Sequence, residues 1–182
     1  GVTSSSNSTL HFATTGNFTE IQIGGSGVTM TGAVPPRGVT FNEETYIVNG
    51  ALFDTDKSTV KFSGVQAASA MTADIDASDG HFPCARYATT WGQFVWVGYT
   101  VESGTSYKNR VRFSKINDAE NWTATDYIDI DIGEDGDYIT ALLPDADRLL
   151  VFKQNSVYAI YGFSRDSFEV WNVTRTAGCR DG

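Results

Sequence analysis

Short alternating runs separated by tight turns fill residues 127–162, which read YIDIDIGEDGDYITALLPDADRLLVFKQNSVYAIYG. In the first run Ile128, Ile130 and Ile132 fall on one side of an extended chain, and the polar positions between them fall on the other. Asp135-Gly136 is a strong signal for a hairpin turn. We therefore expect four consecutive antiparallel strands in one sheet: Tyr127–Ile132, Tyr138–Leu143, Arg148–Lys153 and Ser156–Gly162.

The same strand-and-turn unit recurs upstream at intervals of about 50 residues. A turn precedes each of the strands Thr45–Gly50, Phe94–Gly98 and Arg148–Lys153. A further strand follows each of them, at Thr59–Ser63, Asn109–Ser114 and Ser156–Gly162. Short strands at this period are typical of propeller blades, which are small twisted sheets that need neighbours on both faces. The predicted fold class is therefore all-β, with antiparallel four-stranded sheets arranged as a partial β-propeller.

Two regions are expected along the chain. Residues 1–32 form a polar N-terminal arm with short strands at Thr9–Ala13, Phe18–Ile23 and Gly27–Thr31. Residues 33–182 form a partial β-propeller of about three blades. A closed ring of six blades needs roughly 45 residues for each, so we interpret the sequence as part of a larger chain, or as one completed by neighbouring subunits. The Ala-rich segment Gln66–Ser78 is compatible with a helical turn or with a long loop.

The composition indicates a packed, acidic chain. Of 182 residues, 19% are charged and 13% are aromatic, and the formal net charge is −9. An acidic protein gains no counterion release on nucleic acid and no attraction to anionic membranes, so binding to either is disfavoured. A negative surface is nevertheless suited to line a conduit through which DNA passes without adhering. No apolar run approaches the roughly 18 residues of a membrane-spanning helix, so stable membrane insertion is not expected.

The sequence predicts no catalytic, cofactor or metal site. The acidic turns at 74–80 and 129–137 lack the ligand spacing of an EF-hand loop and are interpreted as solvated turns, with an irregular calcium site as the alternative. His11, His81, Cys84 and Cys179 are too scattered for zinc, and both cysteines are expected to be free thiols. A Gly-x-Ser-x-Gly elbow, a P-loop and a dinucleotide fingerprint are absent from the sequence, so we expect no enzyme.

Aromatic side chains are the most conspicuous candidates for function. The predicted packing or interface anchors are Trp91, Trp96, Trp122, Trp171 and Tyr158. Packing between blades is the favoured interpretation, and sugar-binding platforms are the alternative. Burial distinguishes the two, because a packing residue is enclosed whereas a binding platform stays exposed.

Residues 84–179 carry a resemblance to a known family. Three features follow one another: an Arg-Val-x-Phe-Ser strand at 110–114, Asn121-Trp122 after an acidic turn, and a Phe-Lys-x-x-Ser-hydrophobic-Tyr hairpin at 152–158. In this order they resemble the β-propeller region of tail nozzle or tail-tube-end structural proteins of short-tailed double-stranded-DNA bacteriophages. Residues 40–50 fit the same pattern as a preceding blade.

The resemblance implies a structural virion protein of the phage tail, assembled in the host cytoplasm and without enzymatic activity. Such a protein forms a homo-oligomeric ring, often a hexamer, and packs against other tail or adaptor proteins. Genomic DNA passes through the channel without sequence-specific binding. Two alternatives remain open: a propeller or sandwich glycan-binding module of a virion or cell surface, and a glycan hydrolase, which would need two carboxylates about 5 to 10 Å apart at the axis.

Overall fold

The computed structural model describes residues 8–14, 17–30, 35–51, 57–75, 80–131, 133 and 136–180. In this part of the chain the fold consists of antiparallel β-sheets with a short 3-10 turn, η1 (Arg165–Ser167). The predicted fold class is confirmed at the level of an all-β chain with antiparallel four-stranded sheets. Among the described residues no helix has the length and apolar character needed to cross a membrane.

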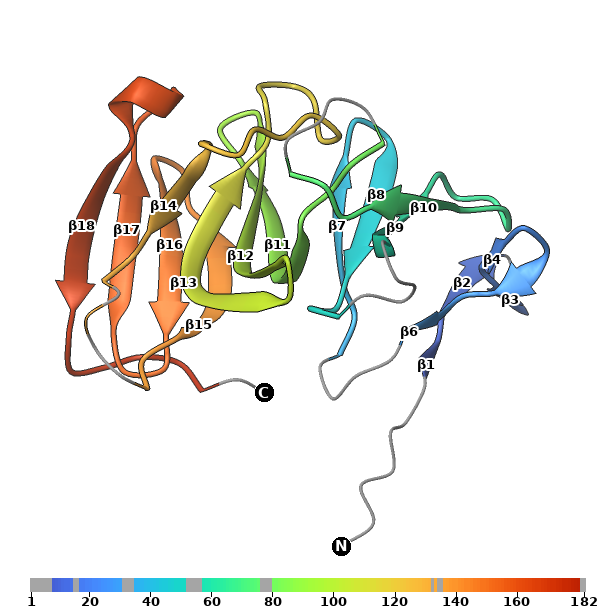
Figure 1. Ribbon diagram of the computed structural model, residues 1–182, viewed down its shortest axis with the longest axis horizontal. Coiled ribbons are helices and arrows are strands. Elements are labelled where there is room, and N and C mark those ends of the chain that lie inside the picture. Colours follow the sequence, from blue (N-terminus) through green and yellow to red (C-terminus); the bar gives the residue numbers. More distant parts are fainter. Residues whose placement is uncertain are drawn as a thin grey trace, which may run out of the picture.

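Three four-stranded sheets follow one another along the chain and stand side by side (Figure 1). Each is a meander, in which every strand pairs with its neighbours in sequence. Sheet A consists of β7 (Arg37–Phe41), β8 (Glu44–Val48), β9 (Lys57–Phe62) and β10 (Ser69–Thr72). Sheet B consists of β11 (Cys84–Trp91), β12 (Phe94–Glu102), β13 (Thr105–Phe113) and β14 (Tyr127–Asp129). Sheet C consists of β15 (Ile139–Pro144), β16 (Arg148–Lys153), β17 (Val157–Tyr161) and β18 (Glu169–Thr174).

Tight hairpins begin sheets A and B. Asn42 and Glu43 join β7 to β8 with φ angles of 48° and 68°, and Gly92 and Gln93 join β11 to β12 with φ angles of 60° and 67°. Two-residue turns with positive φ match the right-handed twist of the strands that they connect. These turns therefore set the register of the first strand pair in each sheet.

The first strands of the three sheets are neighbours in space. β11 packs against β7 of sheet A and also against β15 of sheet C. Gly98 allows β12 also to lie close to β15, since a Cβ atom there would lie only 3.3 Å from side-chain atoms of Ile139 and Leu142. The sheets therefore meet along their inner edges, while their fourth strands, β10, β14 and β18, lie at the other edge of each sheet (Figure 1).

Hydrophobic clusters fill the two seams between the sheets. In seam A/B, Tyr46 and Val48 of sheet A pack with Val95 and Val97 of sheet B. In seam B/C, the buried residues of sheet B pack with those of sheet C; they include Trp91, Phe94, Trp96, Val111, Phe113, Ile139, Leu149, Val151, Tyr158 and Ile160. Because sheet B contributes side chains to both clusters, β12 is buried on both of its faces, as the residues from Phe94 to Thr100 show.

Six short strands form an N-terminal unit on the remaining face of sheet A. They are β1 (Ser8–Thr9), β2 (His11–Thr14), β3 (Asn17–Glu20), β4 (Gln22–Ile23), β5 (Ser26–Gly27) and β6 (Thr29–Met30). Ile21 and Val28 of this unit pack with Val60 of β9, and the Phe12 and Phe62 rings lie 5.1 Å apart. The N-terminal unit thus lies at one end of the row of sheets, and β18 lies at the opposite end (Figure 1).

The prediction that residues 127–162 form one four-stranded sheet is wrong for one of the four strands. β14 pairs with β13 of sheet B rather than with β15. Sheet C gains its fourth strand from β18, where no strand is predicted from the sequence. Ile130 N donates to Asn109 O at 2.9 Å, so pairing with β13 continues beyond β14. Asp137 turns instead toward sheet C, where it accepts from Ser156 Oγ at 2.6 Å. The predicted hairpin turn at Asp135-Gly136 therefore falls where the chain passes from sheet B to sheet C. Asp135 lies outside the described residues.

The Ala-rich segment is neither a helical turn nor a loop throughout. Its residues Ser69–Thr72 form β10 at the edge of sheet A, paired with β9. Met71 of β10 is buried in seam A/B, and this burial stabilises the extended conformation of the segment. Residues 76–79 lie outside the described part of the chain.

Candidate functional site

Four of the five predicted anchors are buried between sheets. Trp91, Trp96 and Tyr158 lie in seam B/C, and Trp122 lies in seam A/B. Trp96 is fully enclosed and donates from its indole nitrogen to Trp91 O at 3.0 Å, while Trp122 donates to Ala119 O at 2.8 Å. Both buried indole N–H groups are therefore hydrogen-bonded, as a stable interior requires.

Tyr158 also connects sheet C to the chain that leaves sheet B. Its hydroxyl donates to the carboxylate of Asp131. Burial and this hydrogen bond raise the pKa of Tyr158, and the same bond lowers the pKa of Asp131. Nearby, the fully buried Lys153 donates to Asp131 O at 3.0 Å and lies 3.5 Å from the carboxylate of Asp137. These contacts hold the crossing segment against β16 and β17, so the role that they indicate is structural.

An aromatic ring enters each seam from the connection between the third and fourth strands of the later sheet. In sheet B this connection carries Trp122, whose ring lies 5.0 Å from that of Phe82. In sheet C the corresponding connection carries Phe168, whose ring lies 4.9 Å from Trp96 and 5.0 Å from Phe113. Phe168 is not among the anchors predicted from the sequence, because no strand is predicted after it to place its ring in a seam.

Polar contacts accompany both of these rings. Beside Trp122, Glu120 accepts from Tyr46 Oη at 3.1 Å and pairs with Lys61 Nζ, which ties the connection of sheet B to sheet A. Beside Phe168, Arg165 Nε lies 3.0 Å from the buried carboxylate of Asp126, which ties the connection of sheet C to sheet B. Burial and the negative charge of Glu120 raise the pKa of Tyr46.

The connection between β9 and β10 makes the equivalent contact in sheet A. Gln22 N donates to Gln66 O at 2.8 Å, and Ala68 N donates to Gln22 O at the same distance. The third connection of every sheet therefore reaches back to the unit that precedes it in sequence. This repeated contact is a property of the row of sheets that the sequence period alone did not reveal.

Trp171, the fifth predicted anchor, is exposed. Its side chain on β18 is 60% accessible, and its indole nitrogen donates to Glu169 at 3.2 Å. The Tyr161 ring meets the Trp171 ring edge-on at 6.3 Å. Together Tyr161, Glu169 and Trp171 line a shallow hollow of about 300 Å³, which we call the Tyr161–Trp171 hollow.

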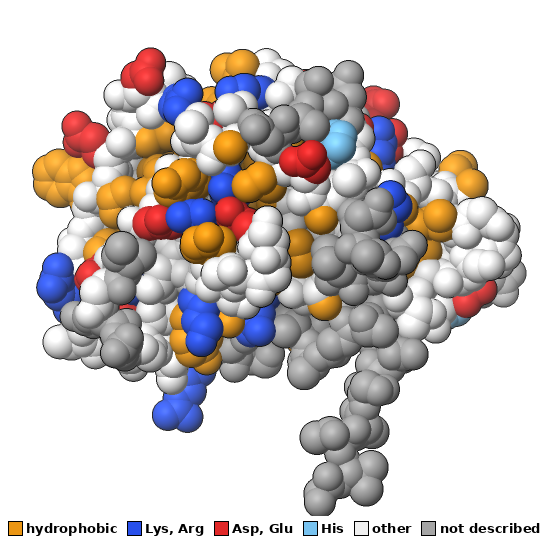
Figure 2. All heavy atoms as spheres, viewed as in Figure 1, with side chains coloured by type: hydrophobic (Ala, Val, Ile, Leu, Met, Phe, Trp, Pro, Cys, Tyr) orange, Lys and Arg blue, Asp and Glu red, His pale blue; other side chains and the backbone are white. Residues whose placement is uncertain are grey.

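This hollow belongs to the face of sheet C that points away from sheet B. Strand pairing places Leu143 opposite Leu150, and Leu150 opposite Ala159, which in turn faces Trp171. Side chains directly opposite one another share a face, so this open face carries Leu143, Leu150, Phe152, Tyr161 and Trp171. Leu143 is 50% accessible, and hydrophobic side chains are exposed at the end of the molecule where β17 and β18 lie (Figure 2).

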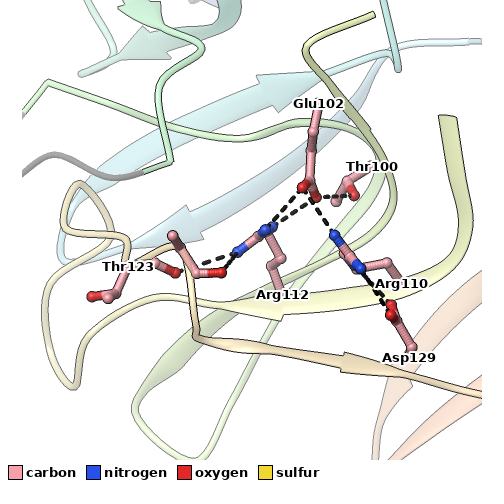
Figure 3. A network of polar contacts seen from close by, with 7 residues as sticks. Thr100, Glu102, Arg110, Arg112, Thr123 and Asp129 are labelled. Atoms are coloured by element: carbon pink, nitrogen blue, oxygen red, sulfur yellow. Dashed lines mark hydrogen bonds and ion pairs between the residues drawn. The ribbon is translucent and has the colours of Figure 1, made fainter. Parts of the chain in front are cut away.

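A network of charges lies on sheet B (Figure 3). Arg112 is buried and binds Glu102 through two bonds, of 2.7 and 2.9 Å, and it also donates to Ala124 O at 3.1 Å. Arg110 joins Glu102 at 3.1 Å to Asp129 at 2.7 Å, so three strands, β12, β13 and β14, are linked. The guanidinium of Arg110 lies 3.9 Å from the ring centres of both Tyr107 and Tyr127.

Electrostatics within this network favour the ionised form of Glu102. Burial alone would raise its pKa, but hydrogen bonds from Arg112 and Thr100 and the charges of both arginines lower it below the ordinary value. Arg112 Nε, Nη1 and Nη2 and both carboxylate oxygens of Glu102 hydrogen-bond to protein partners. We therefore interpret the network as the clamp that attaches the short strand β14 to sheet B.

The residues considered for metal or thiol chemistry are the acidic turns, the histidines and the two cysteines. In that part of the chain no group of three or more His, Cys, Asp and Glu side chains is arranged to hold a metal ion. The acidic turns considered for calcium include residues 76–79, 132 and 134–135, which are not described. Cys84 and Cys179 are both free, the first buried and the second exposed, and burial raises the pKa of Cys84 to about 11.

Comparison of the chain with protein-family models and with curated proteins found no match.

Proposed function

We propose that this chain is a structural component of a phage tail, a nozzle or hub protein, in which its sheets act as blades of a β-propeller. The observation that carries the proposal is the adjacency of the first strands β7, β11 and β15 in three successive four-stranded meanders. Blades of a propeller are arranged in this way around an axis. The resemblance of residues 84–179 to phage tail proteins supports the same function.

The distribution of aromatic residues supports a packing role. Three of the four tryptophans are enclosed in seams, which is the outcome expected of a structural protein rather than of a sugar-binding surface. In this proposal copies of the chain assemble as a homo-oligomeric ring, with six copies as the first stoichiometry to test. The ring contacts other tail or adaptor proteins and surrounds a channel through which DNA passes into the host. The net charge of −9 is compatible with a channel wall to which DNA does not adhere.

Analytical ultracentrifugation and cryo-EM class averages of the purified chain test this function. A ring with an open axial channel, together with no retardation of duplex DNA in a gel-shift assay, is the expected result. A chain that remains monomeric at high concentration would overturn the ring. Tight DNA binding would overturn the non-adhesive channel.

A second function, binding of glycans, is favoured by one observation. Trp171 and Tyr161 expose their rings beside the carboxylate of Glu169, and aromatic rings next to a polar acceptor are common in sugar sites. Titration with oligosaccharides, followed by tryptophan fluorescence in the wild type and in Trp171→Ala, tests it. Saturable quenching that the variant lacks would support glycan binding. No response to any oligosaccharide would reject glycan binding and keep the structural function as the proposal.

A further inference from the structure

Each seam of this molecule is closed by aromatic side chains from the two units that meet there. Phe12 of the N-terminal unit meets Phe62 of sheet A, and Phe168 meets Trp96 of sheet B. In seam A/B, Phe82 lies between the ring of Tyr46 from sheet A and that of Trp122. The open face of sheet C differs from these seams. Among the described residues its Tyr161–Trp171 hollow holds no inserted ring, although two aromatic side chains and an acceptor line it.

The other end of the row carries an exposed aromatic side chain. Phe18 of β3 is 82% accessible, the highest value among the large hydrophobic side chains of the described residues. It lies in the N-terminal unit, which is at the opposite end of the row from β18 (Figure 1). An exposed phenylalanine at one end and an exposed aromatic hollow at the other form a complementary pair on a single chain.

Size and charge are both compatible with contact between these two ends. An apolar cavity of about 150 Å³ is enough to hold benzene, and the hollow measures about 300 Å³. Glu20 is the only Asp, Glu, Lys or Arg in residues 1–36. Residues 163–180 carry three arginines against Asp166 and Glu169. The N-terminal end is therefore nearly neutral and the C-terminal end is slightly positive. The net charge of −9 opposes association through other parts of the surface.

We propose that the occupant of the Tyr161–Trp171 hollow is Phe18 of a second copy of this chain. The contact is head-to-tail, because the two surfaces that meet are different, and repetition of such a contact produces a closed ring or an open filament. Trp171 and Tyr161 supply the type of rigid aromatic surface that dominates the energy of protein interfaces. This inference rests on the proposed function, since it names the contact by which the copies of the ring would join.

The test compares self-association of the 182-residue chain with that of two variants. In sedimentation-velocity experiments over a range of concentrations, Phe18→Ser and Trp171→Ala should each raise the dissociation constant at least tenfold. Phe163→Ser is the matched control, because Phe163 is 80% exposed in the connection between β17 and β18 but does not line the hollow. Both altered side chains are exposed, so far-UV circular dichroism and thermal unfolding should match the wild type.

A mixing experiment distinguishes this contact from other modes of assembly. Phe18→Ser retains the hollow and Trp171→Ala retains the phenylalanine, so an equimolar mixture should form heterodimers and nothing larger. If Trp171→Ala alone loses association while Phe18→Ser keeps it, the open faces pair with each other and the proposal is overturned. A ring that persists in both variants overturns this contact but not the proposed function. A wild-type chain that stays monomeric overturns both.

Discussion

At the scale of single residues, we expect the stability of the fold to depend most on the ion pair between Glu102 and Arg112. Arg112 is 2% exposed, and removing the partner of a buried charge leaves that charge without compensation. We predict that Glu102→Gln lowers the free energy of unfolding by about 2 to 4 kcal/mol. Urea denaturation followed by tryptophan fluorescence measures this change.

An exposed carboxylate provides the control for this variant. Asp145 pairs with Arg148 in a solvent-exposed position, where an ion pair adds little to stability. Asp145→Asn should therefore leave the urea midpoint close to that of the wild type. Equal effects of the two substitutions would contradict the role that we assign to the buried clamp.

Two glutamates make the stability of the chain sensitive to acid. The pKa values of Glu102 and Glu120 are lowered, in both cases because hydrogen bonds and charges from basic side chains outweigh burial, which acts in the opposite direction. A carboxylate with a lowered pKa in the folded state contributes stability above its unfolded pKa, near 4.5, and loses it as the pH falls through the folded value. We expect urea midpoints to fall from pH 5 toward pH 3. The double variant Glu102→Gln, Glu120→Gln should show a shallower fall, and an equally steep one would show that other groups cause it.

The two cysteines should differ sharply in reactivity. Cys179 is exposed, whereas Cys84 is buried at the start of β11 and its pKa is raised to about 11. The thiolate is the reactive form, so a thiol reagent at pH 8 should modify one cysteine quickly and the other only when the chain opens. Rapid modification of two thiols in the native protein would contradict the burial of Cys84. Cys179→Ser is the control that isolates the slow reaction.

At the scale of elements, the connection that carries Phe168 joins sheet C to sheet B. Its ring contacts Trp91, Phe94, Trp96 and Phe113. We predict that Phe168→Ala costs about 2 to 4 kcal/mol. The hydrogen exchange of amides in β12 and β17 should also become faster. Phe163→Ala, five residues earlier and exposed, should change neither quantity by a measurable amount.

Many strands of this fold could be predicted from the sequence, but their grouping into sheets could not. Alternation and turn residues are local signals, and they located β8, β12, β16 and β17 within a few residues. The sheet to which a strand belongs depends on distant partners, and Tyr127–Asp129 offers only three residues of pairing to decide it. The prediction therefore began sheet C one strand too early and omitted β18. It also placed no strand at β7, β10 or β11.

The candidate anchors show the same limit. The aromatic residues chosen from the sequence are indeed where the sheets meet, apart from Trp171. Nothing in its local sequence, Val170-Trp171-Asn172-Val173, separates an indole in a seam from one on an uncovered face. That distinction depends on which side chains pack against the indole in space, and the local sequence does not specify them.

At the scale of the whole molecule, the units form a row in which sheet B lies between seam A/B and seam B/C. Stability in such an arrangement is approximately a sum of units and nearest-neighbour interfaces. We predict that Trp122→Ala in seam A/B speeds hydrogen exchange in sheets A and B and leaves the β16 and β17 amides of sheet C nearly unchanged. Uniform loss of protection along the chain would show instead that the row unfolds as one unit. The matched substitution in the other seam is Phe168→Ala.

The exposure of Trp171 has an optical consequence. Trp91, Trp96 and Trp122 are shielded from solvent, so a soluble quencher such as acrylamide can reach Trp171 far more readily than the other three indoles. The intrinsic emission of the protein therefore contains a signal from the open face of sheet C, and whatever covers that face will change this signal without any added label.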